Sequence, residues 1–453
     1  MPSVPTGTTT STPHSAEAEL IAAVEAALRQ GDVARAETVC QQLLDLVPGQ
    51  LDATAFLCQR ALAAGAAMRA RRLADRAAVQ RPDSGVPPFL LGCALEALGD
   101  RAAALAAFER SVAIDPGQSL AWLRRSAIER ALGRDDAALR SGHIGLDGAG
   151  RDGIGEHLET LPLADRECYV ATWHFVQQAR AVALDAALEP LRKRHGVPAL
   201  ARIQRAIDMH VGRIPQEWPH PQQRPAFLLL PGLQPRPWFE RDEFPYLDAI
   251  EQHTDAIRAE MLAVLTEHAE LRPYVDMAHD APAARIWGDL IDNPRWSAYH
   301  FQRHGERIDA HHARCPRTSA ALAALPLMQI PEHAPEAMFS VLSPRTKIPP
   351  HTGSINGRLI CHLPLVVPKD CGSLACGGEA RPWVEGRCMV FDDSIVHEAW
   401  NDSDQTRVVL IFDLWNPQLT LPEREGLALV IEHITMLNRR WAAASTPGKL
   451  DAH

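Results

Sequence analysis

The sequence predicts a multidomain α + β protein, in which an all-α helical array is followed by a domain of short β-strands with flanking helices. Three observations support this fold class. Glycine, alanine and proline recur in phase over the first third of the chain, short β-type runs dominate after about residue 336, and a proline-rich stretch over residues 213–238 separates the two regions. With 453 residues, the chain is also longer than one hydrophobic core usually supports.

The helical array is indicated by a period of 34 residues. Three residue types keep this period, namely Gly31, Gly65, Gly99 and Gly133, then Ala36, Ala70, Ala104 and Ala138, then Pro48, Pro82 and Pro116. Glycine permits a tight turn between helices, alanine lets two helices approach closely, and proline ends a helix. This pattern is typical of tetratricopeptide repeats, whose arrays bind a peptide or protein or stack on a neighbouring domain. An Ala-rich bundle with accidental spacing is the alternative.

The chain is expected to contain four parts. A Ser/Thr/Pro-rich leader over residues 1–15 is predicted to be disordered, and the repeat array follows over 16–150. Residues 151–225 are predicted to form a helical and linker extension, and 226–453 a second domain. The Gly/Asp-rich segment over 145–157 has the composition of a linker or loop.

Composition excludes several function classes. The formal net charge of -10 offers no basic field for nucleic acid, and we expect no such partner. The sequence contains no apolar run long enough to span a membrane, and its N-terminus lacks the features of a signal peptide. The nine cysteines are odd in number and lack CxxC spacing, as is typical of reduced thiols. These features predict a cytoplasmic protein without a membrane partner.

The second domain is predicted to be a β-sandwich or barrel. Short β-type runs lie at 337–343, 357–367, 386–393, 397–402 and 406–415, separated by turn-rich segments. In the second run, alternation places Arg358, Ile360 and His362 on one face of a strand, and Leu359, Cys361, Leu363 and Leu365 on the other. One face is therefore expected to join the core, and the other to carry an arginine and a histidine toward a ligand.

An ordered set of three residues indicates the chemistry of this domain. His351 precedes one predicted strand, His397 follows a distant turn, and Arg407 opens the next strand. Two histidines and a later arginine fit a 2-oxoglutarate oxygenase, because the far carboxylate of the cosubstrate needs a fixed cation such as a guanidinium. The usual third ligand of such iron sites is a carboxylate two residues after the first histidine, but Gly353 occupies that position here.

The sequence is less specific about the roles of other polar residues near this set. Asp392, Asp393 or Glu398 can orient a ligating imidazole, but Asp392 and Asp393 can equally cap a turn. The adjacent His311 and His312 are expected at the surface or in a loop.

Several longer segments carry a family resemblance. They are "FLLLPGLQPRPWFE", "MFSVLSPRTKIPPHTG", "NGRLICHL", "PLVVPKDCGSLACGGEARPWVEGRCMVFDDSIVHEAWND" and "RVVLIFDLWNPQLTLPER". Over about residues 226–430 the chain resembles the aspartyl/asparaginyl β-hydroxylase family. The resemblance implies a double-stranded β-helix (jelly-roll or cupin-like) dioxygenase that uses Fe(II), 2-oxoglutarate and O2. It also explains Gly353, because this family has glycine at that position and water in place of the carboxylate ligand.

The resemblance implies a role for each matching residue. His351 and His397 are expected to hold the iron, Ser340 and Arg407 the distal carboxylate of 2-oxoglutarate, and His362 the metal-proximal end of the cosubstrate. It places Arg358 beside the substrate, where it can pair with an acidic side chain. Family members similar to the animal enzyme carry a second arginine where this chain has Ile360.

The predicted function is therefore hydroxylation of an aspartyl, asparaginyl or related side chain of a peptide or protein, with the repeat array helping to bind it. Four alternatives stay open. The β-domain can have lost catalysis and left a tetratricopeptide adaptor, or the enzyme can act on a small molecule or on a lipid-linked acyl chain. A halide filling the site that faces Gly353 would instead give a halogenase.

Overall fold

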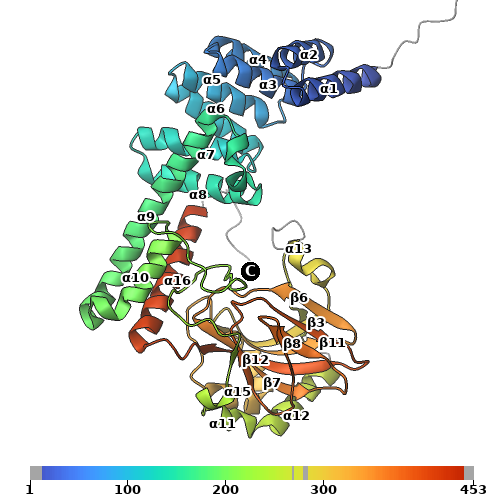
Figure 1. The fold of residues 1–453 in the computed structure, drawn as a ribbon, viewed down its shortest axis with the longest axis vertical. Coiled ribbons are helices and arrows are strands. Elements are labelled where there is room, and N and C mark those ends of the chain that lie inside the picture. The colour runs from blue at the N-terminus through green and yellow to red at the C-terminus, as the bar shows by residue number, and fades with distance from the viewer. Residues whose placement is uncertain (1–12, 268–269, 279–283, 443–453) are drawn as a thin grey trace, which may run out of the picture. The chain divides into compact units, whose positions relative to one another are not determined.

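The computed structural model describes residues 13–267, 270–278 and 284–442, which form two compact units (Figure 1). The first unit runs to Ala179 and includes the chain from Asn438, whereas the second comprises Arg180–Leu437. Most of the predicted leader over 1–15 lies outside the described residues, which begin with the first helix at Pro13. The domain boundary expected near residue 226 falls inside the second unit, because helical residues before it pack into that unit's core.

The first unit contains four consecutive helix pairs. They are α1 (Pro13–Arg29) with α2 (Val33–Leu46), α3 (Leu51–Ala63) with α4 (Ala67–Gln80), α5 (Val86–Ala97) with α6 (Arg101–Ile114), and α7 (Ser119–Ala131) with α8 (Asp135–Arg151). The four periodic glycines form the turns inside the pairs with φ between 70° and 83°, a backbone conformation that favours glycine. The four periodic alanines are fully buried between helices. The predicted tetratricopeptide array is confirmed.

The segment over 145–157 corrects the sequence analysis in part. We expected a linker there, but α8 continues through it to Arg151, and only the residues beyond form turns and short 3₁₀ segments. A Cβ atom added to Gly145 would lie 2.9 Å from Leu123, and one on Gly148 would lie 2.5 Å from Ser119. These glycines therefore allow α8 to approach α7 closely, so their composition reflects helix packing.

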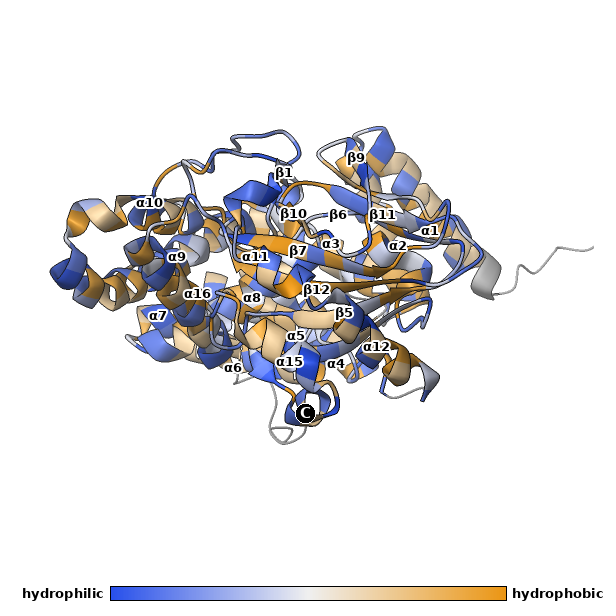
Figure 2. Ribbon diagram, turned by 90° about the horizontal axis from the view of Figure 1, so that it is seen from below, coloured by the Kyte–Doolittle hydropathy of each residue, from blue (hydrophilic) through white to orange (hydrophobic). Residues whose placement is uncertain are grey.

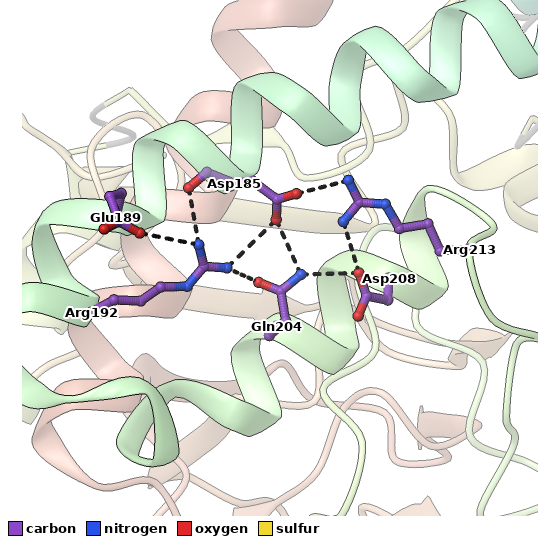
Figure 3. Close-up of polar contacts among 6 residues, drawn as sticks. All are labelled: Asp185, Glu189, Arg192, Gln204, Asp208 and Arg213. Carbon is purple, nitrogen blue, oxygen red and sulfur yellow. Dashed lines mark hydrogen bonds and ion pairs between the residues drawn. The ribbon is translucent and has the colours of Figure 1, made fainter.

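Three helices frame the second unit. The second half of α9 (Leu163–His195) packs with α10 (Ala201–His210) and with α16 (Leu421–Ala442) around a shared apolar core. A polar network also joins α9, α10 and the loop that follows, and its members are Asp185, Glu189, Arg192, Gln204, Asp208 and Arg213 (Figure 3). Arg213 bonds Asp185 at 2.7 Å and Asp208 at 3.1 Å, so it ties the loop to both helices.

Two antiparallel sheets form the rest of this unit. The larger sheet has the order β1-β10-β7-β12-β5-β3-β2, with β4 paired to β3, and the smaller has the order β6-β11-β8-β9. The larger sheet's strands are β1 (Trp238–Phe239), β2 (Arg272–Pro273), β3 (Trp296–Arg303), β4 (Glu306–Arg307), β5 (Ala337–Leu342), β7 (Arg358–Val366), β10 (Met389–Phe391) and β12 (Arg407–Trp415). The smaller sheet's strands are β6 (Thr346–His351), β8 (Ser373–Cys376), β9 (Glu379–Pro382) and β11 (His397–Asn401). Each predicted β-type run contains one of these strands.

The larger sheet has two different faces. One face packs on short helices, and β7 contributes the residues Leu359, Cys361, Leu363 and Leu365 that alternation predicted for the core. The helices around it are α11 (Leu247–Glu251), α12 (Thr254–Thr266), α14 (Asp309–Arg314) and α15 (Pro316–Ala323), while α13 (Ala284–Trp287) contacts β6. The central strands β7 and β12 are accordingly mostly hydrophobic in Figure 2. The other face meets the smaller sheet in a second core, next to the candidate site.

The histidine pair on α14 is buried, so the expectation of a surface or loop position was wrong. His311 and His312 have exposed fractions of 8% and 4%. The His311 ring stacks on Tyr299 at 4.0 Å, and its Nδ1 lies 2.6 Å from the carbonyl oxygen of His300. His312 Nδ1 lies 2.7 Å from Ser319 Oγ. Each imidazole is buried because the fold supplies polar partners that sequence spacing does not reveal.

Close packing of α8 on α7 predicts opposite outcomes for two glycine substitutions in the same helix. Gly145→Ala should lower the free energy of unfolding by about 1–3 kcal/mol, because the new methyl group overlaps Leu123. Gly150→Ala meets no atom within 4 Å, so it should be neutral or stabilising by up to about 1 kcal/mol. Urea unfolding followed by circular dichroism measures both. Equal effects of the two variants would contradict the packing assignment.

Candidate active site

A cavity of about 220 Å³ is bounded by strands of both sheets. All six residues that the sequence analysis assigned to a site line this cavity, although they come from five strands. They are Ser340 on β5, His351 on β6, Arg358 and His362 on β7, His397 on β11, and Arg407 on β12.

The two histidines face each other because of strand pairing. His351 ends β6, His397 begins β11, and the antiparallel register places the two residues opposite each other. Their ring centroids are 4.1 Å apart, with an angle of 54° between the ring planes. The two side chains are therefore close enough to bind one ion between them.

Both imidazoles present the same nitrogen to the cavity. His351 Nδ1 lies 2.8 Å from the carbonyl oxygen of Pro349, and His397 Nδ1 lies 3.0 Å from that of Ile395. A carbonyl oxygen can only accept a hydrogen bond, so each Nδ1 carries the proton and each Nε2 presents a lone pair. Burial, together with the nearby His397 ring, lowers the pKa of His351 to about 3, and burial lowers the pKa of His397 to about 4. Both rings are neutral at pH 7, as metal ligation requires.

The acidic residues near His397 have other partners. Asp392 accepts the backbone N–H of Ser394 at 3.0 Å and the side-chain amide of Gln223 at 3.1 Å, so it caps the turn before β11. Asp393 instead binds Arg358. The rings of the two histidines are oriented through backbone carbonyls, not through the carboxylates that the sequence analysis considered.

Gly353 and Asp393 fit together sterically. A Cβ atom built on Gly353 would lie 2.0 Å from Asp393 Oδ2, which is far inside van der Waals contact. The backbone N–H of Gly353 also donates to the carbonyl oxygen of Asp393 at 2.6 Å. The Asp393 carboxylate therefore occupies the space that a side chain at position 353 would need, and this packing excludes a His-x-Asp ligand pair.

Arg407 is a buried cation without a carboxylate partner. Its exposed fraction is 1%, and its Nε and Nη1 atoms have no hydrogen-bond partner among the described residues. Its guanidinium lies 4.6 Å from the centre of the Trp383 ring, and burial lowers its pKa to about 10. A guanidinium buried without a counter-ion is costly, and these two unpartnered donors could accept an anion in the cavity.

Ser340 and His362 lie on strands next to Arg407 and have tryptophan partners. Trp296 Nε1 donates to Ser340 Oγ at 3.1 Å, and Trp383 Nε1 donates to His362 Nδ1 at 3.3 Å. Because His362 Nδ1 accepts a hydrogen bond, its proton lies on Nε2 in the neutral ring. Burial, aided by Arg407 and His397, lowers the pKa of His362 well below its usual value. The Ser340 hydroxyl and the Nε2–H of His362 are thus neutral hydrogen-bond donors on the strands beside Arg407.

Arg358 is already paired inside the chain. Its Nη2 donates to Asp393 Oδ2 at 2.5 Å, and its Nη1 lies 3.7 Å from Asp413 Oδ2. Burial alone would lower the pKa of Arg358, but the two carboxylates outweigh burial and raise it. Burial raises the pKa of Asp413 to about 7. Arg358, which the resemblance places beside a substrate, therefore belongs to a buried cluster of one arginine and two aspartates.

Comparison with known proteins assigns the chain to a family. Residues 251–417 match the model of the aspartyl/asparaginyl β-hydroxylase family. The chain is 31% identical over 246 residues to aspartate β-hydroxylase domain-containing protein 2 of Mus musculus, and the match covers 54% of this chain and 68% of the mouse protein. The chain belongs to the aspartyl/asparaginyl β-hydroxylase family.

Other members of this family have names that state different substrates. The human aspartyl/asparaginyl β-hydroxylase is 31% identical over 202 residues, which are 44% of this chain and 25% of the human protein. The ornithine lipid ester-linked acyl 2-hydroxylase of Rhizobium tropici is 34% identical over 183 residues, which are 40% of this chain and 61% of that enzyme. Hydroxylation is thus common to these names, but the substrate class is not.

Solved structures add little to this assignment. A crystal structure of MamA overlaps 45% of the chain and 97% of MamA, with 13% identity and a TM-score of 0.30. This score is too low to support a conclusion.

No helix within the described parts of this β-hydroxylase-family chain is both long enough and apolar enough to cross a membrane. The cytoplasmic setting expected from the sequence stays a prediction.

Sequence reasoning missed several residues in or next to the cavity. Trp296 binds Ser340 and Trp383 binds His362, Asp413 lies near Arg358, and Glu336 lines the cavity. Only Asp413 had a usable signal. It lies six residues after Arg407 on one strand, and period-2 alternation puts both on the same face. The tryptophans reach the site from β3 and from the segment after β9, so only the tertiary fold brings them there.

Steric contact between Gly353 and Asp393 predicts that Gly353→Ala will displace the Asp393 carboxylate. The free energy of unfolding should fall by about 1–3 kcal/mol, because the new methyl group overlaps a buried charged group. Ser354→Ala, one residue later, is the matched control and should be nearly neutral. Urea titration gives both values. Unchanged stability of Gly353→Ala would show that position 353 can accommodate a side chain.

Proposed function

We propose that this chain is an Fe(II)- and 2-oxoglutarate-dependent dioxygenase that hydroxylates an aspartyl, asparaginyl or related side chain of a peptide or protein. One observation carries the proposal. The same buried cavity contains two neutral imidazoles with free Nε2 lone pairs and a guanidinium without a counter-ion, as a metal and a dicarboxylate would together require. Family membership supports the hydroxylase part of this proposal.

The residues present fit a ferrous ion held by two protein ligands. His351 and His397 would supply Nε2, since their Nδ1 atoms are bound to backbone carbonyls. No group of three or more His, Cys, Asp or Glu side chains that could hold a metal occurs in the described parts of the chain. A side chain at position 353 could not act as a third ligand, because the Asp393 carboxylate fills the space that it would need.

The residues also fit 2-oxoglutarate. Arg407 would bind the far carboxylate through its unpartnered Nε and Nη1, and Ser340 lies beside it on β5, the strand next to β12. His362 would donate from Nε2 to an oxygen of the cosubstrate nearer the metal, because its Nδ1 is held by Trp383. A carboxylate would thereby satisfy a buried cation that is otherwise unpaired.

Bound iron, 2-oxoglutarate and O2 would together supply the oxidant, with one oxygen atom entering a C–H bond as C–OH and the other entering succinate as CO2 leaves. The protein itself would orient the ligating imidazoles, keep water out of the cavity and hold the proton of each ring on Nδ1. The Nδ1 hydrogen bonds hold both imidazole planes, and Trp287, whose ring lies 4.7 Å from the His351 ring, helps to enclose the cavity. The double-stranded β-helix expected from the resemblance is part of this proposal, supported by the two antiparallel sheets.

The alternatives predict different observations. An adaptor that has lost catalysis would convert no 2-oxoglutarate to succinate, whether or not a peptide is present. A lipid-acyl hydroxylase, suggested by the Rhizobium relative, would oxidise acyl chains and leave peptides unchanged. We favour a peptide or protein because the chain also carries a tetratricopeptide array, a kind of repeat that offers surfaces to peptides.

Loss of either histidine should remove the reaction. His351→Ala and His397→Ala should reduce iron-dependent succinate formation from 2-oxoglutarate to background, a fall of about 10²-fold or more. The exposed His253→Ala in the same unit is the control and should retain full turnover. Succinate is measured by NMR with anaerobically added Fe(II) and then oxygen. Full succinate formation by either cavity variant would reject the iron site.

Replacing Arg407 should affect stability and 2-oxoglutarate binding in different ways. Arg407→Met removes a buried cation that has no carboxylate partner, so the free energy of unfolding should stay constant or rise. The KM for 2-oxoglutarate should nevertheless increase by about 10²-fold, since the distal carboxylate loses its partner. The exposed Arg272→Met serves as control. A destabilised variant with unchanged KM would assign Arg407 a structural role.

A further inference from the structure

The two ends of the cavity differ in charge along a single strand. Arg407 and Asp413 both lie on the cavity face of β12, with Val409 and Ile411 between them, and the other face joins the helix-covered core. Six residues of extended strand separate the two ends by roughly 20 Å. In the proposed function Arg407 binds the cosubstrate, so the Asp413 end is where the substrate side chain would enter.

Three buried polar atoms at the Asp413 end lack partners among the described residues. They are Asp413 Oδ1, Asp393 Oδ1 and Arg358 Nε. Asp413 is fully buried, Asp393 has an exposed fraction of 4%, and all three residues line the cavity. The other oxygen of each carboxylate is already engaged, since Asp393 Oδ2 binds Arg358 and Asp413 Oδ2 accepts the backbone N–H of Glu336 at 2.8 Å. When both carboxyl groups are ionised, this end therefore lacks two hydrogen-bond donors and one acceptor.

We propose that the Asp413 end selects a carboxamide, so that the substrate side chain is asparaginyl and not aspartyl. A primary carboxamide carries two N–H donors and one carbonyl acceptor, which is the set that Asp413, Asp393 and Arg358 lack. This inference rests on the proposed function and adds to it the class of side chain.

A carboxylate substrate would fit this end poorly. It has no donor for Asp413 Oδ1 or Asp393 Oδ1, and it would bring a further carboxylate beside two buried carboxyl groups. The cation at this end, Arg358, already binds Asp393 and lies 3.7 Å from Asp413. A site built to hydrogen-bond a donor rejects an analogue without that donor strongly, because its buried acceptors are left unpaired.

A cationic side chain would fit no better. Lysine supplies donors but no acceptor, so Arg358 Nε would stay unpaired and a second positive charge would lie beside the guanidinium. Ile360 strengthens the preference for a neutral group. It pairs with Asp413 across the ladder between β7 and β12 and lines the same end, where it contributes only apolar surface.

The test uses the full-length enzyme and synthetic peptides with degenerate flanking residues that differ only in a central Asn, Asp or Lys. Hydroxylation is followed by mass spectrometry as the gain of one oxygen atom. The kcat/KM for the Asn series should exceed that for the Asp and Lys series by at least about 10²-fold. Substrate-free conversion of 2-oxoglutarate to succinate is measured in parallel.

A charge variant checks whether this end of the cavity sets the preference. Ile360→Arg adds a cation opposite Asp413, so the ratio of Asn to Asp turnover should fall at least about tenfold, mainly through a lower KM for Asp peptides. Ile360→Leu keeps an apolar side chain and should leave the ratio unchanged.

The possible failures are distinguishable. Equal or better turnover of Asp or Lys peptides would overturn the carboxamide assignment, and so would an Asn-to-Asp ratio that Ile360→Arg does not change. Hydroxylation of none of the three series, with substrate-free succinate formation intact, would also overturn it while leaving the oxygenase proposal standing. Complete absence of 2-oxoglutarate conversion would refute the proposed function itself.

Discussion

The antiparallel pairing of β6 with β11, whose register shifts just after His397, is the constraint on which the site depends. It brings His351 and His397 to 4.1 Å between ring centroids, although 45 residues separate them in sequence. The backbone also fixes the protonation of both rings, because each Nδ1 is bound by the carbonyl two residues earlier. A shift of one residue in register would turn one ring to the opposite face of the sheet, so the metal site and the fold are specified by the same strand pairing.

The cavity combines features that reduce stability with features that position a ligand. Arg407 is buried without a counter-ion, and three polar atoms at the Asp413 end have no partner among the described residues. Such groups are costly in a protein interior, and they are expected mainly where function requires them. Tryptophans reduce this cost, since Trp383 lies over the guanidinium of Arg407 and also donates to His362. The larger sheet is apolar on its opposite face, and its packing on the helices there holds these residues in place.

Much of the architecture could be predicted from the sequence because it depends on local periodicity. The glycine turns at positive φ, the buried alanines and the alternation of β7 all follow from spacing within one element. Periodicity failed where tertiary packing decides the outcome. The glycines of α8 have a linker composition but pack against α7, and His311 is buried because it meets Tyr299 and the carbonyl oxygen of His300. The pairing of Arg358 with Asp393 likewise requires knowledge of how β7 lies beside the turn before β11.

One measurement tests the account most directly, namely anomalous X-ray diffraction from crystals of the full chain soaked anaerobically with Fe(II) and 2-oxoglutarate. The account predicts one iron peak between Nε2 of His351 and Nε2 of His397, no carboxylate of the protein bound to it, and a dicarboxylate reaching Arg407. A peak at another position, or a protein carboxylate among the ligands, would contradict the two-histidine site.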